Sequence, residues 1–265
     1  KEILFNKIIE GGVLVNDDPM HKKTKSLDIQ YTCFQNCYTD DGNGYGTALL
    51  MGAENVAFYY ASTVDCPLKN STSKPKGAQF DILADSIYSE FINVTGGKST
   101  YCGGMEYREA TSGFFQFQTI AEIDCKYAIS FTSVSILNLT IKSCNVYKNS
   151  VNRAPNEDYK SNPPALVFVR TKDCVVENFY FIQNNLNGVG LFTAKENDDK
   201  LTITLINCYA DTNNNYYWNK EYIITTNCNF TNAAINTFPL RQLNLGHCQG
   251  EQPPGEMIIT SFFTP

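Results

Sequence analysis

Basic clusters and long apolar runs are both missing from this chain of 265 residues. Its 21 Lys and Arg stand against 27 Asp and Glu, which gives a formal net charge of −6 at pH 7. Because phosphate backbones bind stripes of positive charge, we expect no nucleic-acid partner. No apolar run is long enough to span a bilayer as a helix, so we expect no membrane contact by this segment. If the protein has an anchor, we expect it beyond Pro265.

Histidine is scarce as well, and its two copies, His21 and His247, are expected near opposite ends of the fold. This separation argues against a Ser-His-Asp or Cys-His catalytic site. A zinc site with His and Cys ligands is not expected either, because the chain has no Cys-x-x-Cys pair and its closest cysteines are Cys33 and Cys37.

Cysteine, by contrast, is plentiful, with ten copies that mostly follow a polar residue. If one interval is counted as two units, the cysteines of successive polar-then-cysteine steps lie about 20 to 35 residues apart. That period is typical of solenoids, in which one supersecondary unit stacks on the next. The steps are Asn36-Cys37, Asp65-Cys66, Asp124-Cys125, Asp173-Cys174, Asn207-Cys208, Asn227-Cys228 and His247-Cys248, with Ser143-Cys144 as a looser copy.

Short strands with a period of two occupy the segments between these steps. In 135–141, for example, Leu137, Leu139 and Ile141 fall on one face, while Asn138 and Thr140 fall on the other. Bends rich in Asn and Asp follow such strands, and Asn side chains of successive coils can hydrogen-bond in a ladder.

These strands predict an all-β, right-handed parallel β-helix, a solenoid of the pectin-lyase-like kind. A sandwich of hairpins would show many two-residue Asn-Gly or Asp-Gly turns, and only Asp41-Gly42 and Asn187-Gly188 offer that signal. We expect an N-terminal cap or first coil over 1–28, the solenoid over 29–250 and an exit segment toward a stalk over 251–265. Residues 1–10 fit a short capping helix and a first strand equally well.

Cysteine usage predicts an oxidising compartment, so that the protein is secreted or lies on the extracellular face of the cell surface. The start at Lys1 reads as a mature chain whose signal has been removed. We expect disulfides among all ten cysteines, and proximity along the stack favours Cys33–Cys37, Cys125–Cys144 and Cys208–Cys228. The cysteines are Cys33, Cys37, Cys66, Cys102, Cys125, Cys144, Cys174, Cys208, Cys228 and Cys248. Four sequons predict a glycoprotein: Asn70, Asn93, Asn138 and Asn229.

Three segments carry a family resemblance: 32–37 (TCFQNC), 42–49 (GNGYGTAL) and 56–60 (VAFYY). They resemble the repeat of polymorphic outer-membrane-protein-like surface proteins, in which a Phe-x-Asn-x element precedes a Gly-rich turn and an apolar strand. With its cysteines and its terminal Phe-Thr-Pro, the chain is similar to the trichomonad surface families of this kind, although it lacks clear Gly-Gly-Ala-Ile tetrads. The resemblance implies a β-helical ectodomain at a cell surface, with adhesion or host contact as its role.

Many β-helices are polysaccharide lyases or glycoside hydrolases, so a carbohydrate-active enzyme is the alternative function. A polygalacturonase-like site needs acidic residues from neighbouring coils, followed by Gly-His-Gly and Arg-Ile-Lys elements. Here the Asp-Asp pairs are 40–41 and 198–199, and Gly246-His247-Cys248 matches poorly. The sequence therefore identifies no catalytic residue.

Two local features are candidate binding sites. Asp40, Asp41 and Asn43 form an oxygen-rich, glycine-turned segment that could bind Ca²⁺ or be a plain turn; we expect no other cofactor. The aromatic run Tyr216, Tyr217 and Trp218 could stack on a sugar, anchor a protein or pack over the neighbouring coil.

Together these features predict an adhesin-like recognition protein whose partner is a protein or glycan on a host or neighbouring cell. A structural surface-coat protein is the second alternative.

Overall fold

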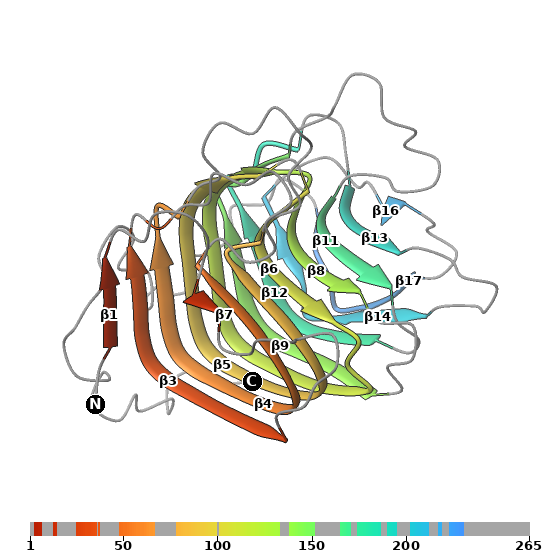
Figure 1. The fold of residues 1–265 in the computed structure, drawn as a ribbon. Coiled ribbons are helices and arrows are strands. Elements are labelled where there is room, and N and C mark those ends of the chain that lie inside the picture. Colours follow the sequence, from red (N-terminus) through yellow and green to blue (C-terminus); the bar gives the residue numbers. More distant parts are fainter. Residues whose placement is uncertain are drawn as a thin grey trace, which may run out of the picture.

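The computed structural model describes the chain in segments that together form one stack of parallel strands (Figure 1). The described residues are 3–6, 13–14, 25–35, 37, 48–66, 78–99, 101–132, 138–151, 165–170, 174–186, 190–194, 202–211, 217–218 and 223–230. Every pairing between the described strands is parallel, and these residues contain no helix. The fold is a right-handed parallel β-helix, which confirms the predicted fold class.

Seventeen strands form the described part of the solenoid. They are β1 (Ile3–Asn6), β2 (Val13–Leu14), β3 (Ser26–Gln35), β4 (Leu49–Val64), β5 (Phe80–Lys98), β6 (Cys102–Arg108), β7 (Ser112–Cys125), β8 (Tyr127–Thr132), β9 (Asn138–Tyr147), β10 (Ser150–Val151), β11 (Ala165–Arg170), β12 (Cys174–Ile182), β13 (Gly190–Ala194), β14 (Ile203–Ile206), β15 (Tyr209–Ala210), β16 (Tyr217–Trp218) and β17 (Ile223–Thr226). Residues 1–10 were expected to form either a capping helix or a first strand, and Ile3–Asn6 form a strand.

The register divides the coils into three faces. Face one contains β2, the starts of β4 and β5, and then β6, β8, β11, β13 and β16. Face two contains the first part of β3, the middle of β4 and β5, the first parts of β7, β9 and β12, and then β14 and β17. Face three contains β1, the ends of β3, β4 and β12, the later parts of β5, β7 and β9, and β15.

A single residue in the left-handed conformation turns the chain from face two to face three in seven coils, from β4 to β17. By register these residues stack into one column, and their φ angles lie between 51° and 55°. We call this column the first corner; it contains Tyr60, Phe91, Phe117, Ser143, Asn178, Asn207 and Asn227. A second corner, after face three, stacks Asp65, Gly96, Glu122, Lys148 and Gln183, also with positive φ. The polar residue of several polar-then-cysteine steps occupies one of these corners, and the cysteine after it turns inward.

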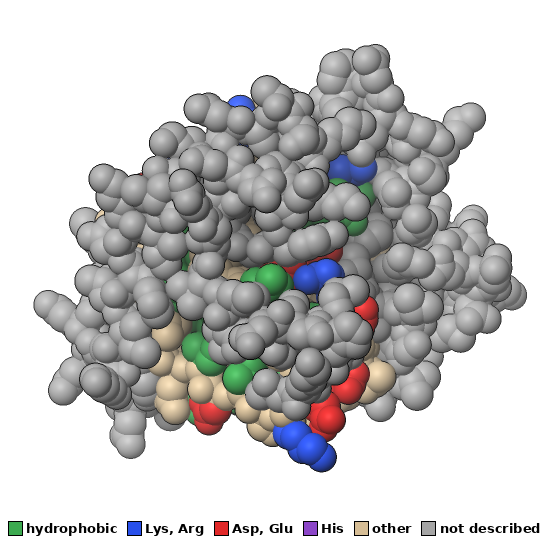
Figure 2. Space-filling view, viewed as in Figure 1, with side chains coloured by type: hydrophobic (Ala, Val, Ile, Leu, Met, Phe, Trp, Pro, Cys, Tyr) green, Lys and Arg blue, Asp and Glu red, His purple; other side chains and the backbone are tan. Residues whose placement is uncertain are grey.

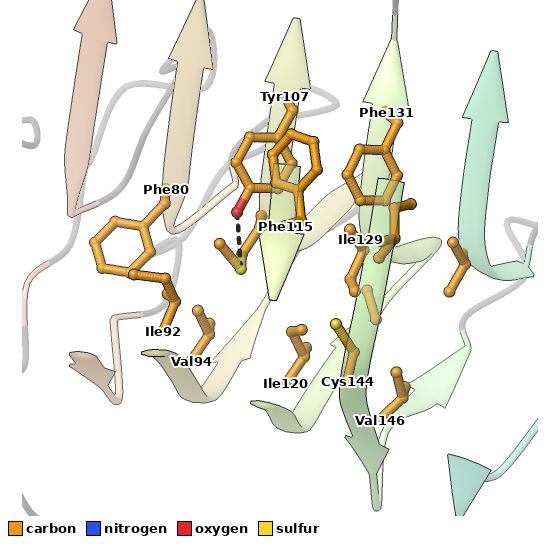
Figure 3. Packing of buried hydrophobic residues seen from close by; sticks show 14 of the residues in the cluster. Phe80, Ile92, Val94, Tyr107, Phe115, Ile120, Ile129, Phe131, Cys144 and Val146 are labelled. Carbon is orange, nitrogen blue, oxygen red and sulfur yellow. Dashed lines mark hydrogen bonds between the residues drawn. The ribbon is translucent and has the colours of Figure 1, made fainter. Parts of the chain in front are cut away.

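Side chains that point inward form apolar columns along the stack. Ile92 and Cys144 on face three belong to one column, interrupted between them by the buried amide of Gln118, which donates to Ser89 and Tyr107. Val94, Ile120 and Val146 form the next column (Figure 3). The core also contains an aromatic cluster of Tyr107, Phe115 and Phe131, whose ring centroids lie 4.3 to 5.3 Å apart. Fully burying one such side chain stabilises the fold by about 1.5 to 3 kcal/mol.

Buried amides join coils beside the second corner. Asn149 is fully buried; its Nδ2 donates to the Ile120 carbonyl at 2.9 Å and to Asn184 Oδ1 at 3.1 Å. Its Oδ1 accepts from the Ile123 N–H at 3.0 Å. At the first corner, Asn227 Nδ2 donates to Asn207 Oδ1 at 2.7 Å. The expected ladder of asparagine amides is therefore present at these two places.

No helix among the described segments combines the length and apolar character needed to cross a membrane.

Candidate recognition surface

The predicted binding residues fall largely outside the described part of the chain. Asp40, Asp41, Asn43 and Tyr216 lie outside it, and Tyr217 and Trp218 are described by backbone alone, as β16. β16 pairs with Phe192 and Thr193 of β13, which places it on face one. Among the described residues, no group of three His, Cys, Asp or Glu side chains could hold a metal ion.

The sequons occupy different environments. Asn229 is exposed beside β15, whereas Asn93 is half-buried on face three and its Oδ1 has no hydrogen-bond partner. Asn138 begins β9, and its side chain lies outside the description, as does all of Asn70. Glycosylation at these four positions stays a prediction.

The cysteines divide into one disulfide-bonded residue, Cys33, and eight thiols. The thiols are Cys37, Cys66, Cys102, Cys125, Cys144, Cys174, Cys208 and Cys228; Cys248 lies outside the described residues.

None of the three cysteine pairings expected from the sequence is a bond in this structure. Cys33 lies in an outward column, where it accepts a hydrogen bond from Ser62, whereas Cys37 is a buried thiol one corner further on. Cys125 pairs in register with Val151, and Cys144 lies on another face. Cys208 and Cys228 are in contact, but as thiols. For the first two pairs, proximity along the sequence does not capture the face on which each cysteine lies, whereas Cys208 and Cys228 are neighbours as expected.

The most distinctive surface feature is a group of six aromatic side chains around the first corner, here called the aromatic ridge. They come from β4, β5 and β7, on three successive coils. Figure 2 shows hydrophobic side chains at the surface in the lower left of the view, where β4 and β5 run, with acidic side chains close by. The ridge consists of Tyr59, Tyr60, Tyr88, Phe91, Phe114 and Phe117.

Two parallel stacks make up the ridge. At the corner, Phe91 stacks on Tyr60 with ring centroids 4.9 Å apart and on Phe117 with centroids 5.0 Å apart. On face two, Tyr88 stacks on Phe114 at 5.4 Å. Tyr59 lies edge-on to both Tyr60 and Tyr88 and so connects the two stacks. Tyr88 is 43% exposed and the other five are half-buried.

The corner stack sits on strained backbone. Tyr60, Phe91 and Phe117 have φ of 53°, 55° and 51°, a conformation that costs roughly 1 to 2 kcal/mol for a residue with a side chain and that bulky residues rarely adopt. In the later coils of the same column, Ser143, Asn178, Asn207 and Asn227 replace the rings. Asn tolerates this conformation well, so the aromatic residues are the costlier choice at the first three positions. Strain of this kind is often retained at functional sites.

Carboxylates bind the two tyrosine hydroxyls of face two. Tyr88 donates to Glu90 Oε2 at 2.6 Å, and Tyr59 donates to Asp28 Oδ2 at 3.2 Å. The hydrogen bond to Glu90, together with partial burial, raises the pKa of Tyr88 to about 12. The ridge therefore combines an apolar surface with neighbouring carboxylates, and Tyr88 stays neutral near pH 7.

A pair of carboxylates on face one bears on the enzyme alternative. Asp81 and Glu106 are register neighbours on adjacent coils, and Arg108 Nε donates to Asp81 Oδ1 at 2.7 Å. Burial raises the pKa of Asp81 to about 6, while the Arg108 charge opposes this shift. Asp81 is fully buried and Glu106 is 5% exposed, so these carboxyl groups are shielded from a polysaccharide chain.

Comparison of the chain with protein-family models, with curated proteins and with solved structures finds no match.

Sequence reasoning missed the aromatic ridge, although a signal was present. Tyr60, Phe91 and Phe117 recur at intervals of 31 and 26 residues, and Tyr88 and Phe114 at 26. These intervals match the coil length, but the rings align only once the register and the bulky left-handed corners are known.

Proposed function

We propose that this chain is a recognition protein, secreted or displayed at a cell surface, that binds a protein partner on a host or neighbouring cell through the aromatic ridge. The observation that carries the proposal is the set of three bulky rings at strained corner positions, where later coils use Ser and Asn. An aromatic residue there costs stability, and half-exposed aromatic rings are favoured anchors in protein interfaces.

The arrangement of the rings favours a protein over a glycan. A sugar stacks on the open face of a ring, but both faces of Phe91 and one face of each of the other four stacked rings are covered by a neighbouring ring. Their edges remain available, and these suit contact with apolar and main-chain groups of a protein. Asp28 and Glu90 beside the rings, together with a net charge of −6, favour a partner with basic residues at its rim.

The later coils supply the substitution that tests the proposal. The double variant Phe91→Asn, Phe117→Asn places at the corner the residue found at Asn178 and Asn207. Fluorescently labelled protein is added to cultured epithelial cells that are untreated, protease-treated or glycosidase-treated. We expect the natural chain to bind untreated and glycosidase-treated cells, and both protease treatment and the double variant to reduce binding at least tenfold.

A second aromatic stack provides the matched control. Tyr180 and Tyr209 stack at 5.5 Å in an outward column of face three, where Thr119 occupies an earlier coil. Tyr180→Thr should leave cell binding unchanged. Equal binding by the Phe91→Asn, Phe117→Asn variant would overturn the ridge as the contact surface. Loss of binding after glycosidase treatment alone would indicate that the partner is a glycan and not a protein. Self-association of the chain without cell binding would favour the surface-coat function.

A further inference from the structure

Two pairs of cysteine thiols stack one coil apart, and Cys66, Cys208 and Cys228 each directly follow a corner residue. Gln35 pairs in register with Val64, so Cys37, two residues on, lies beside Cys66. Tyr209 pairs with Asn229, so the preceding residues Cys208 and Cys228 are neighbours in the same way. In both pairs the side chains turn toward the core, and Cys37, Cys66 and Cys208 are buried.

Contacts within the pairs link the two coils. The Cys208 N–H donates to Cys228 Sγ at 3.4 Å, and Cys228 Sγ donates to the Leu205 carbonyl of the neighbouring coil at 3.4 Å. Cys66 Sγ likewise donates to the Phe34 carbonyl, one coil away, at 3.6 Å. Adjacent strands lie about 4.8 Å apart, which is within the usual range of about 4.4 to 6.8 Å between the Cα atoms of a disulfide.

We propose that these thiols form two disulfides, each of which joins neighbouring coils of the solenoid: Cys37–Cys66, which the sequence did not indicate, and Cys208–Cys228, which it favoured. Formation requires a low-molecular-weight disulfide as oxidant. One cysteine thiolate attacks a sulfur of that disulfide and releases one small thiolate, and its partner then attacks the mixed disulfide and releases the second. Two protein thiols are oxidised and one small disulfide is reduced to two thiols. The inference concerns the scaffold and stands whether or not the ridge binds a partner.

The two pairs differ in access. Cys228 is partly exposed, and a hydrogen bond from Cys208 lowers the pKa of its thiol, so it is the more reactive member of its pair. Cys208 is buried, its pKa is raised, and it is placed to resolve the mixed disulfide. Cys66 is buried and its pKa is also raised, chiefly through its hydrogen bond with Cys37. The first pair must therefore close during folding, whereas the second can also close in the folded protein.

Other cysteines provide internal controls. Cys144 stacks on Phe179 within the apolar core, and Cys174 lies between Leu139 and Ile203 in its column. Burial raises the pKa of Cys144 to about 12 and that of Cys174 further. These two residues are expected to stay thiols, because neither has a cysteine as its register neighbour.

The test is disulfide mapping of the full chain. The chain is refolded in a mixture of reduced and oxidised glutathione, remaining thiols are blocked, and peptides are analysed by mass spectrometry without reduction. We expect linked peptides for Cys37–Cys66 and Cys208–Cys228, with Cys144 and Cys174 blocked as thiols. A Cys33–Cys37 link, or blocking of all four stacked cysteines in the refolded chain, would overturn the proposal.

The rate of oxidation tests the second pair separately. When the reduced, folded chain meets oxidised glutathione, the mixed disulfide should appear first on Cys228 and then disappear as the link to Cys208 forms. In Cys208→Ala the mixed disulfide should instead accumulate on Cys228, by at least tenfold over the natural chain. Modification of Cys144 or Cys174 at a rate equal to that of Cys228 would contradict the assignment.

Discussion

Phe91 stacks face to face on Tyr60 with ring centroids 4.9 Å apart and ring planes 3° from parallel, although both residues have left-handed backbones. The contact joins two coils at a corner. Aromatic contacts of this kind contribute about 0.5 to 1.5 kcal/mol beyond burial, which is similar to the roughly 1 to 2 kcal/mol of backbone strain at each residue. Stability alone therefore gives little reason for rings at this corner.

Phe115 and Phe117 should respond very differently to truncation, although only one residue separates them. Phe117→Asn removes one stacking contact and relieves strain, so the free energy of unfolding should change by less than about 1 kcal/mol. Phe115→Ala leaves a cavity beside Tyr107 and Phe131 and should cost about 3 to 5 kcal/mol. Urea unfolding measures both, and equal costs would contradict the inward and outward assignment.

Asn149→Ala should be strongly destabilising for its size. It leaves the Ile123 N–H and the Ile120 carbonyl without their side-chain partner inside the protein, at a cost of roughly 2 to 4 kcal/mol. Asn227→Ala removes an exposed amide contact to Asn207 and should cost under about 1 kcal/mol. Thermal unfolding of both variants gives the comparison; a smaller loss for Asn149→Ala than for Asn227→Ala would refute a structural role for the buried amide.

Asp81 should make the fold less stable as the pH rises from about 4 to about 6. Its pKa is raised from 3.8 to about 6 in the folded protein, so over this range the folded state holds a proton that the unfolded state has released. The loss amounts to roughly 2 to 3 kcal/mol and is complete above the folded pKa. Denaturant unfolding at several pH values measures it, with Asp81→Asn expected to remove this part of the slope and Asp28→Asn, at an exposed site, expected to retain it.

Gly104→Ala should damage the fold more than Gly113→Ala. A Cβ on Gly104 would overlap the backbone carbonyl oxygen of Ala128, which cannot move without displacing the neighbouring coil. A Cβ on Gly113 would meet the side chains of Phe115 and Leu139, which can adjust at lower cost than a backbone carbonyl can, although both are packed in the core. Hydrogen exchange in the coils around each site, combined with thermal unfolding, separates the two; a milder effect at Gly104 would argue against the close approach of these coils.

The fold was accessible from the sequence because its signals repeat. Alternation of apolar and polar residues gave the faces, and the polar-then-cysteine steps marked places where the chain turns inward, as at Asp65 and Cys66 or Asn207 and Cys208. Asparagine at bends also indicated the amide ladders, since Asn accepts left-handed backbone and bonds its neighbours.

The candidate surface was not accessible in the same way. Tyr60, Phe91 and Phe117 read as ordinary strand residues, because bulky side chains rarely occupy left-handed corners. Their alignment depends on register between coils of unequal length, which spacing alone leaves open. The same limit affected the cysteines: Cys33 and Cys37 are close in sequence, yet a corner separates them, and the thiol beside Cys37 is Cys66.

The aromatic ridge places at least one ring on each of three successive coils, so its length is set by the number of coils with an aromatic corner. A single substitution from Ser to Phe at position 143 would extend it by one step of about 4.8 Å, without changing the contacts of the existing rings. Duplication or deletion of an entire coil would change the footprint in the same discrete steps. In a solenoid the contact surface, and with it the partner, can thus change by whole coils, while the stacking between coils that stabilises the fold is preserved.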